Sequence, residues 1–152
     1  MPLDFPGVPQ LFKQSRSNDE GINKRNSPSR IFAVSGHEFK AADTTKELTY
    51  NSGACEVVTD EAALICSIFI PDNATITSIK VTGTAAVETY ILRRLNIILS
   101  TEDNMTGNIA IGTATTAISF PVIDNTKYVY YVRTTTLDTG EIIDGLKIEY
   151  SE

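Results

Sequence analysis

The sequence is poor in the residues that most often carry chemistry. Its 152 residues include two cysteines, one histidine and no tryptophan. Two cysteines and one histidine cannot supply the four ligands of a zinc site unless carboxylates join them, and no metal-ligand spacing is present. Cys55 and Cys66 each lie in an apolar or strand-like run. We expect them to be reduced core residues, and a disulfide between adjacent strands is the alternative.

Long apolar runs are also missing. No stretch reaches the roughly 18 apolar residues that a membrane span requires. Residues 1–14 lack a basic segment followed by an apolar one, so we expect no secretory signal. The glycines are scattered singly and form no phosphate-binding loop. The sequence therefore predicts no membrane partner, no cofactor and no metal.

Charge is distributed unevenly along the chain. Residues 1–40 carry six basic and four acidic side chains, a net charge of +2, whereas residues 41–152 carry seven basic and fifteen acidic ones, a net charge of −8. An acidic body repels a phosphate backbone, so nucleic acid is not an expected partner of the folded part. The weak positive charge of the first 40 residues fits a polar linker as well as it fits an RNA contact.

The composition changes near Asn51 and divides the chain in two. Residues 1–50 hold four of the six prolines and almost no periodic apolar pattern. Proline fixes φ and disfavours helix in the residue before it, so residues 2–12 are expected to be extended. The sequence predicts an extended N-terminal arm over residues 1–50 and a β domain over residues 51–152. Residues 31–54 fit either part.

The arm is the predicted partner-binding element. Apolar side chains in its first segment have no partner within the arm, and basic side chains follow in a polar linker. The apolar side chains would dock in a groove of a partner subunit, and the basic ones would meet an acidic surface. A disordered tail is the alternative. The contact residues proposed on this basis are Leu3, Phe5, Val8, Leu11, Phe12, Arg16, Lys24, Arg25 and Arg30.

From Cys55 onward, short β-branched and aromatic runs alternate with turn residues. Eight or nine strands at this spacing are typical of an all-β antiparallel sandwich, and a jelly roll is the best single prediction. The expected strands are residues 55–59, 63–70, 75–82, 87–93, 95–100, 108–112, 117–120, 127–135 and 141–150.

The clearest local pattern lies at the C-terminal end. Apolar and polar side chains alternate in residues 127–135 and again in residues 141–150. This pattern predicts an antiparallel hairpin with one solvent-exposed face, closed by a turn at Asp138-Thr139-Gly140. Tyr128 and Tyr130 are expected in the core, with Tyr131 on the outer face. The alternative is an exposed tyrosine row that stacks on sugars or on a protein.

One string matches a catalytic signature. Asp138-Thr139-Gly140 resembles the motif of retroviral aspartic proteases, but only twelve residues follow Gly140, too few for the rest of that fold. His37 lies in a polar segment without a nucleophile elbow. The acidic pairs at 60–61 and 102–103 fall in expected turns, where carboxylates are common and solvated. We expect no catalytic residues and no enzymatic activity.

Two regions of the chain together resemble a known class of domain. They are residues 70–81, which begin Ile-Pro-Asp-Asn-Ala-Thr-Ile, and residues 122–132, Val-Ile-Asp-Asn-Thr-Lys-Tyr-Val-Tyr-Tyr-Val, followed by Asp-Gly-Leu-Lys-Ile-Glu-Tyr at 144–150. This order resembles small all-β domains of phage and environmental virus proteins. The resemblance implies a jelly-roll subunit of the capsid decoration, cement or fibre type, often trimeric, on the virion surface. It leaves the arm unmatched.

Two hypotheses follow. The favoured one is a non-enzymatic viral structural protein that binds the major capsid protein or other virion subunits through its arm. An arm of this kind loses its conformational freedom only when it binds. The alternative is a carbohydrate- or receptor-binding β-sandwich, with the tyrosine strand or the loop acids as its platform.

Overall fold

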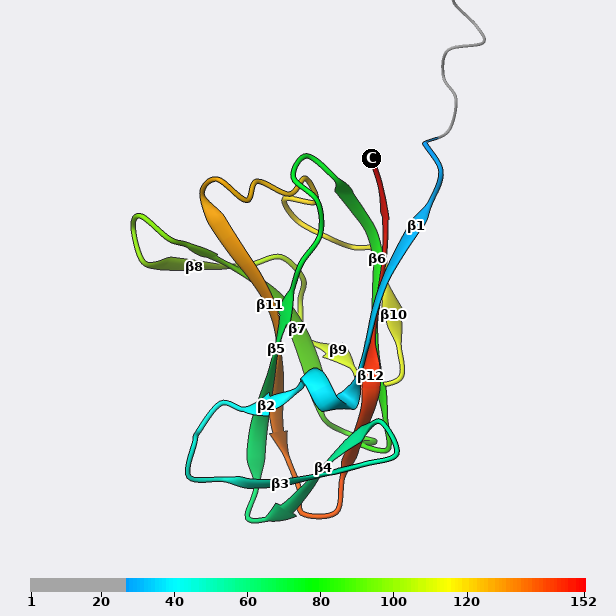
Figure 1. Cartoon of the computed structure of the whole chain (residues 1–152), viewed down its shortest axis with the longest axis vertical. Coiled ribbons are helices and arrows are strands. Elements are labelled where there is room, and N and C mark those ends of the chain that lie inside the picture. The colour runs from blue at the N-terminus through cyan, green and yellow to red at the C-terminus, as the bar shows by residue number, and fades with distance from the viewer. Residues whose placement is uncertain (1–26) are drawn as a thin grey trace, which may run out of the picture.

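The computed structural model describes residues 27–152, which form a two-layered β-sandwich (Figure 1). All strand pairings are antiparallel. This confirms the predicted all-β antiparallel sandwich. Among residues 27–152 there is no helix with the length and hydrophobicity that a membrane crossing needs. Eight of the nine predicted arm contacts, from Leu3 to Arg25, lie outside the described residues.

The first sheet, sheet A, forms one layer of the sandwich. Its strand order is β10-β6-β12-β4-β3, and β1 pairs with the part of β12 beyond β4. The strands are β1 (Arg30–Ser35), β3 (Glu47–Asn51), β4 (Ala54–Thr59), β6 (Thr75–Gly83), β10 (Ala114–Thr115) and β12 (Ile142–Ser151).

The second sheet, sheet B, faces it. Its order is β2-β5-β11-β7-β8, with β9 also paired to β7. The strands are β2 (Lys40–Ala41), β5 (Ala62–Ile68), β7 (Thr89–Asn96), β8 (Thr101–Asn104), β9 (Ile109–Ala110) and β11 (Tyr128–Leu137). Between β1 and β2 the chain makes a short 3₁₀ turn, η1 (Gly36–Glu38).

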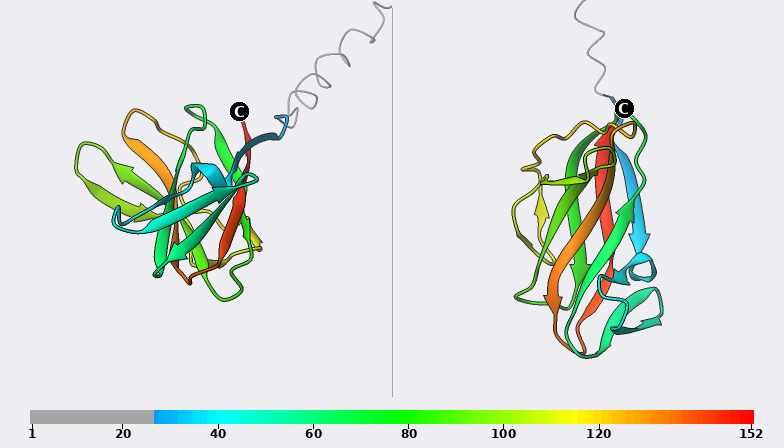
Figure 2. Two further views of the ribbon diagram at one scale, coloured as in Figure 1. Left: turned by 60° about the horizontal axis from the view of Figure 1, so that its bottom comes forward. Right: turned by 90° about the vertical axis from the view of Figure 1, so that its left-hand side faces the viewer.

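The chain winds between the two sheets in jelly-roll order. Strands β4, β5, β6 and β7 fall alternately in sheets A, B, A and B, and β10, β11 and β12 alternate again after β8 and β9. Figure 1 shows the two layers side by side, and in the right-hand view of Figure 2 β11 (orange) in sheet B lies in front of β12 (red) in sheet A. Two layers wound in this way are the arrangement of a jelly roll, as predicted.

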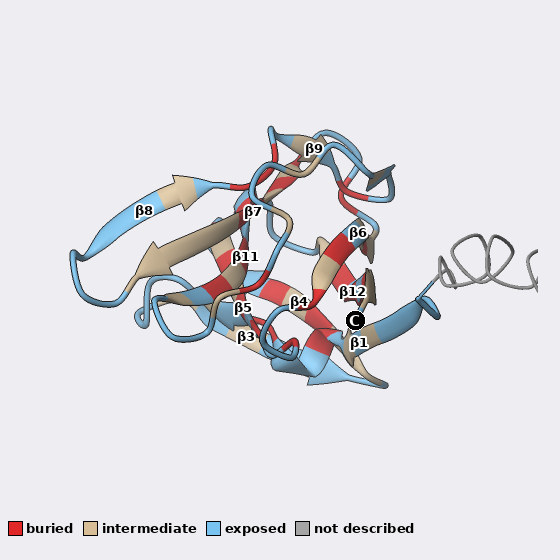
Figure 3. Ribbon diagram, turned by 90° about the horizontal axis from the view of Figure 1, so that it is seen from above, coloured by how far each residue is buried: buried red, intermediate tan, exposed pale blue. Residues whose placement is uncertain are grey.

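The core lies between the sheets because each strand alternates apolar inner residues with more polar outer ones. The buried residues gather there in Figure 3, whereas β8 and the start of β1 are largely exposed. Among residues 27–152, Tyr90 in β7 is the largest side chain that is fully buried. Its hydroxyl lies 2.9 Å from the Ile79 carbonyl oxygen and 2.8 Å from that of Thr113, so it joins the two layers.

The β body begins earlier than the composition indicated. β1 pairs with β12 from Arg30 onward, and β2 and β3 each join a sheet. Residues 30–50 therefore belong to the sandwich, and the boundary expected near Asn51 is wrong. The apolar residues of this segment are few but well placed, since Phe32 and Val34 pack against the core and Phe39 is fully buried.

The predicted C-terminal hairpin is also wrong. β11 and β12 are both long alternating strands, but β11 belongs to sheet B and β12 to sheet A. Their connecting turn crosses from one layer to the other and is tied to β4, where the Gly140 N–H donates to the Val57 carbonyl at 2.7 Å. Alternation shows that a strand has one buried face, but it does not show which sheet the strand joins.

Other strand assignments differ as well. Residues 97–100, expected at the end of a strand, form a turn. Residues 102–104, expected to form a turn, are strand β8, and residues 117–120, expected to form a strand, are irregular. The acidic residues of β8 have a weak intrinsic preference for strands. Here they face Arg93 and Arg94 of β7 and form ion pairs with them, which stabilises the pairing.

Candidate binding groove on sheet B

A groove of about 910 Å³ lies on the outer face of sheet B. Its floor is β11, with the end of β5 and the following loop on one side and β8 on the other. The groove therefore lies on the face of the sheet that points away from the core. The lining residues are Ile65, Ser67, Ile68, Phe69, Ile70, Pro71, Glu102, Asn125, Tyr128, Val129, Tyr130, Tyr131 and Arg133.

The outward residues of β11 form the floor. Tyr130 and Val132 are buried, so the intervening Val129, Tyr131 and Arg133 point away from the core. Across the sheet, Tyr131 is paired with Ser67 of β5 on one side and with Arg93 of β7 on the other. The predicted position of Tyr131 on the outer face is thus confirmed.

A hydrogen-bonded cluster lies at the centre of the floor. The Tyr131 hydroxyl donates to Glu102 Oε1 at 2.6 Å, and Arg93 Nη1 donates to Glu102 Oε2 at 3.2 Å. Both carboxylate oxygens are therefore engaged. The pKa of the Tyr131 hydroxyl is raised, first by partial burial and then by its hydrogen bond to Glu102. The tyrosine ring is held in place from two strands.

The wall on the β5 side is apolar and accessible. Phe69 follows the last residue of β5 and is 80% exposed, and Val129 on the floor is 48% exposed. Pro71 continues this wall. Large apolar side chains so fully in contact with water mark a surface that another molecule can cover.

The opposite wall is positioned by Arg94. Its guanidinium lies 3.8 Å from the Phe120 ring centre and 4.2 Å from the Tyr128 ring centre. Nε and Nη2 of Arg94 each lie 3.0 Å from Asp103 Oδ2. Stacking and charge-assisted hydrogen bonds together restrain β8, and with it Glu102 on the adjacent outward position.

Two arginines on this face retain unused donors. The Nε of Arg93 is the single buried side-chain nitrogen or oxygen within residues 27–152 that has no hydrogen-bond partner. Arg133 is exposed and forms no ion pair with any residue from 27 to 152. Both side chains also line a second hollow of about 270 Å³, together with Thr89, Asn108 and Thr135.

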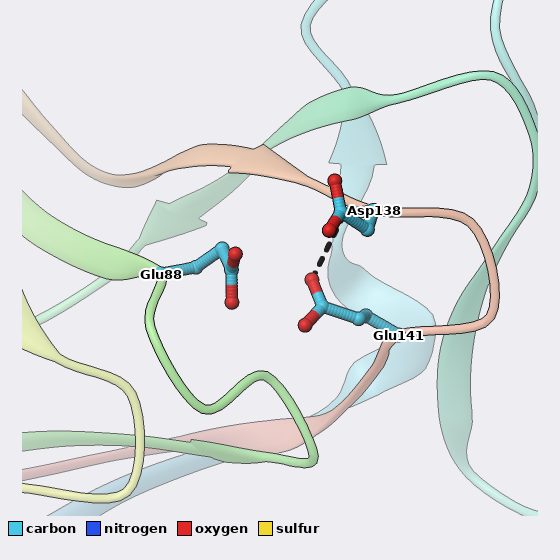
Figure 4. Close-up of side chains that lie close together, drawn as sticks. All are labelled: Glu88, Asp138 and Glu141. Carbon is cyan, nitrogen blue, oxygen red and sulfur yellow. Dashed lines mark hydrogen bonds between the residues drawn. The ribbon is translucent and has the colours of Figure 1, made fainter.

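A separate acidic cluster lies away from the groove, around the turn that joins β11 to β12. Atoms of Glu88, Asp138 and Glu141 lie within 4.8 Å of one another (Figure 4). The Asp138 N–H donates to Glu141 Oε2 at 2.8 Å. The pKa of Glu141 is raised, mainly by burial and further by the neighbouring Glu88 carboxyl. Asp138 of the protease-like string therefore lies in a turn between the sheets.

The other residues considered as site candidates in the sequence lie outside the groove. Arg30 was expected in the arm, but it begins β1 and forms an ion pair with Glu152 at 3.0 Å. His37 is exposed on η1, with its ring edge-on to Tyr50 at 5.8 Å between centres. Cys55 and Cys66 are free and buried on strands of opposite sheets, and burial raises the pKa of each thiol to about 11.

Sequence reasoning missed the two arginines, Arg93 and Arg133, and it named Glu102 only as one of the loop acids of the alternative binding platform. The alternation of β11 contained the signal for Arg133, since that residue shares a face with Tyr131. The contact between Arg93 and Glu102 was not predicted, because β7, which contains Arg93, was expected as two strands (residues 87–93 and 95–100) and Glu102 was assigned to a turn. Their partnership depends on the register of β7 with β8, which no local pattern reveals.

Comparisons with known proteins assign no family to this chain. No protein-family model and no curated protein matches it. Among solved structures, the CBM22-1-GH10 modules of Clostridium thermocellum endo-1,4-β-D-xylanase 10B with xylohexaose match at a TM-score of 0.46 and 18% identity, over 82% of this chain and 28% of that one.

Two other solved structures match at a TM-score of 0.40. They are a family two carbohydrate esterase from Cellvibrio japonicus, 8% identical over 83% of this chain and 34% of that one, and the xylan binding module CBM86 from Roseburia intestinalis, 9% identical over 82% and 96%. This chain thus spans only about a third of the first two proteins.

Proposed function

We propose that this protein binds carbohydrate in the groove on sheet B, as a binding module without catalysis. The observation that carries the proposal is the floor of the groove, where the Tyr131 ring is fixed through its hydroxyl by Glu102 and lies near the exposed Phe69. Sugars present apolar C–H faces together with hydroxyl groups. A site for them needs aromatic surface and polar groups side by side.

The composition of the groove meets both needs. Phe69, Val129 and Tyr131 supply apolar and aromatic surface, while Ser67 and Asn125 supply hydrogen-bonding groups. These side chains are carried largely by paired strands, so most of the site is formed before a ligand arrives. A preformed site loses less conformational entropy on binding.

The test is a binding screen with soluble polysaccharides and their oligosaccharides, followed by calorimetry on each one that binds. Tyr131→Ala should weaken binding at least about tenfold, because stacking surface and hydroxyl are both lost. Tyr50→Ala is the matched control, since Tyr50 is a 45% exposed tyrosine on β3 of the other sheet. Lack of binding to every glycan, or wild-type binding by Tyr131→Ala, would refute the proposal.

Attachment to a capsid through the N-terminal arm is a second proposal, and it concerns a different part of the chain. It rests on the apolar and basic residues of the arm and on the resemblance to virion subunits. Arg30 begins β1 in sheet A, whereas the groove is on sheet B. Deleting residues 1–26, which spares β1, should abolish attachment to capsids. Attachment at the wild-type level would contradict the proposal.

A further inference from the structure

We infer that the glycan bound in the groove is acidic, and that Arg133 with Arg93 selects its carboxylate groups. This inference rests on the proposed carbohydrate binding and adds the class of sugar: a saccharide that contains uronic acid, rather than a neutral one. Three observations on the outer face of sheet B support it.

The first is the position of Arg133. It lies on the floor two residues after Tyr131, on the same face of β11, and it lines the groove and both smaller hollows beside it. No carboxylate among residues 27–152 pairs with it. A guanidinium offers five N–H donors in a planar fork that matches a carboxylate. Arg133 thus presents a complete fork to any ligand in the groove.

The second is the unsatisfied donor of Arg93. Glu102 engages Nη1 of this arginine, but Nε is buried without a hydrogen-bond partner. Buried donors are almost always satisfied, and one without a partner beside a hollow is best satisfied by an acceptor that binds there. Arg93 lines the second hollow together with Arg133. A ligand carboxylate in the second hollow would accept from Arg133, and it would accept from the Arg93 Nε once a small movement of that side chain exposes the buried donor.

The third is the local charge. Tyr131 pairs across the sheet with Arg93 and Arg133 pairs with Ile91, which makes the two arginines diagonal neighbours on adjacent strands. Such positions lie roughly 7–8 Å apart, close enough for two like charges to repel. Of residues 27–152, Glu102 alone is acidic and lines the groove or the second hollow, and its two oxygens are already engaged. Because Glu102 offsets the charge of Arg93, one net positive charge remains in this group, and an additional negative charge would neutralise it.

Other acidic groups do not neutralise this pair. Asp43 and Glu61 line the third hollow with Arg133, together with Lys46, but neither forms an ion pair with Arg133. The net charge of −8 over residues 41–152 repels anions at long range. At physiological salt this repulsion is screened beyond about 8 Å, so direct contacts with the two arginines decide the selection.

The experiment compares acidic polysaccharides with their own carboxyl-reduced forms. Polygalacturonate, alginate and glucuronoxylan are each assayed by calorimetry before and after reduction of the uronic acids to neutral sugars. Wild type should bind at least one acidic form about tenfold or more tightly than its reduced partner, because a carboxylate makes charge-assisted hydrogen bonds to the arginine fork. Added sodium chloride should weaken only the acidic form's binding.

Variants assign the effect to residues. Arg133→Gln should lose the preference, so that the acidic and the reduced forms bind it with equal affinity. Arg133→Lys should keep only part of the preference because an ammonium lacks the fork. Arg30→Gln on β1 is the control and should bind as wild type does. Arg133 is exposed on the sheet surface, so its replacement should leave the fold intact.

Two outcomes would overturn the inference and leave carbohydrate binding standing: equal binding of acidic and reduced forms, or an undiminished preference in Arg133→Gln. A third outcome, in which neither acidic nor neutral glycans bind, would overturn the proposed function and this inference together.

Discussion

Replacing Tyr90 with phenylalanine tests how the two sheets are held together. The Tyr90 hydroxyl approaches the carbonyl oxygens of Ile79 on β6 and Thr113 beside β10, and both belong to the opposite layer. The side chain is only 1% exposed, so water cannot replace the lost donor. The substitution removes one oxygen atom and leaves the ring and its packing unchanged.

The expected cost follows from this geometry. One proton serves two acceptors, so about one hydrogen bond is lost, worth roughly 0.5–1.5 kcal/mol net. The buried carbonyls retain a second lone pair, so they do not incur the full penalty of an unsatisfied group. We therefore expect Tyr90→Phe to lower the free energy of unfolding by about 1–2 kcal/mol.

Alkaline pH gives an independent readout of the same hydroxyl. Burial raises the pKa of Tyr90 to about 12 in the folded protein, against an ordinary value of 10.0. Because the folded pKa is raised, this contribution to stability is complete below about pH 10 and is lost as the pH rises toward 12. Phenylalanine does not titrate. The difference in stability between wild type and Tyr90→Phe should therefore narrow over this interval.

Urea unfolding followed by circular dichroism measures both effects. Tyr150→Phe is the control, since the Tyr150 hydroxyl makes no hydrogen bond to any residue from 27 to 152 and Tyr150 is also partly buried; its change should stay within about 0.5 kcal/mol. Equal stability of Tyr90→Phe and wild type at neutral pH would refute the reasoning. A difference that stays constant up to pH 12 would refute the role of burial.

Three further changes test other parts of the sandwich. A methyl group at Gly36 would clash with the Ile143 carbonyl and would lie 2.6 Å from the Cys55 amide nitrogen. Gly36→Ala should therefore lower the free energy of unfolding in urea by about 3 kcal/mol or more. Gly107→Ala is the control and should change this free energy little, because the space beside Gly107 is open. Cys55 and Cys66 are fully buried and their thiol pKa values are about 11, so both should resist alkylation near neutral pH until the protein is denatured. Mass spectrometry measures the alkylation, and rapid labelling of the native protein would contradict this prediction. Arg94→Lys removes the stacked guanidinium and should make β8 more mobile, which would be measured as faster amide hydrogen exchange over residues 101–104. Unchanged exchange would show that the guanidinium does not stabilise β8.

The sequence carried enough information for the architecture but not for the site. Alternation in residues 127–135 identified the strand that the structure shows as β11 and placed Tyr131 outward, because a period of two follows directly from the pleat. The partner of β11 could not be read in this way. Turn chemistry at Gly140 permits a tight reversal within one sheet as well as a crossing between sheets, and only the packed core distinguishes the two.

The groove depends on contacts between distant segments. Glu102 reaches Tyr131 and Arg93 only because β7 pairs with β8 and with β11, and its own sequence neighbourhood is typical of a turn. The misplaced boundary has a similar origin. Phe32, Val34 and Phe39 are scattered among polar residues, and their burial is decided by the ladder between β1 and β12 at the far end of the chain.

The pairing of β1 with β12 also determines how the molecule responds to tension. Arg30 lies opposite Tyr150, so the chain enters and leaves the sandwich at neighbouring points of one antiparallel ladder. A force that pulls these two points apart acts along the inter-strand hydrogen bonds, which lie perpendicular to the strands, and breaks them pair by pair from the Arg30 end. β1 should therefore peel off at low force. No residue of β1 lines the groove. Detachment of β1 should therefore extend the chain and lower the tension before the groove on sheet B is deformed.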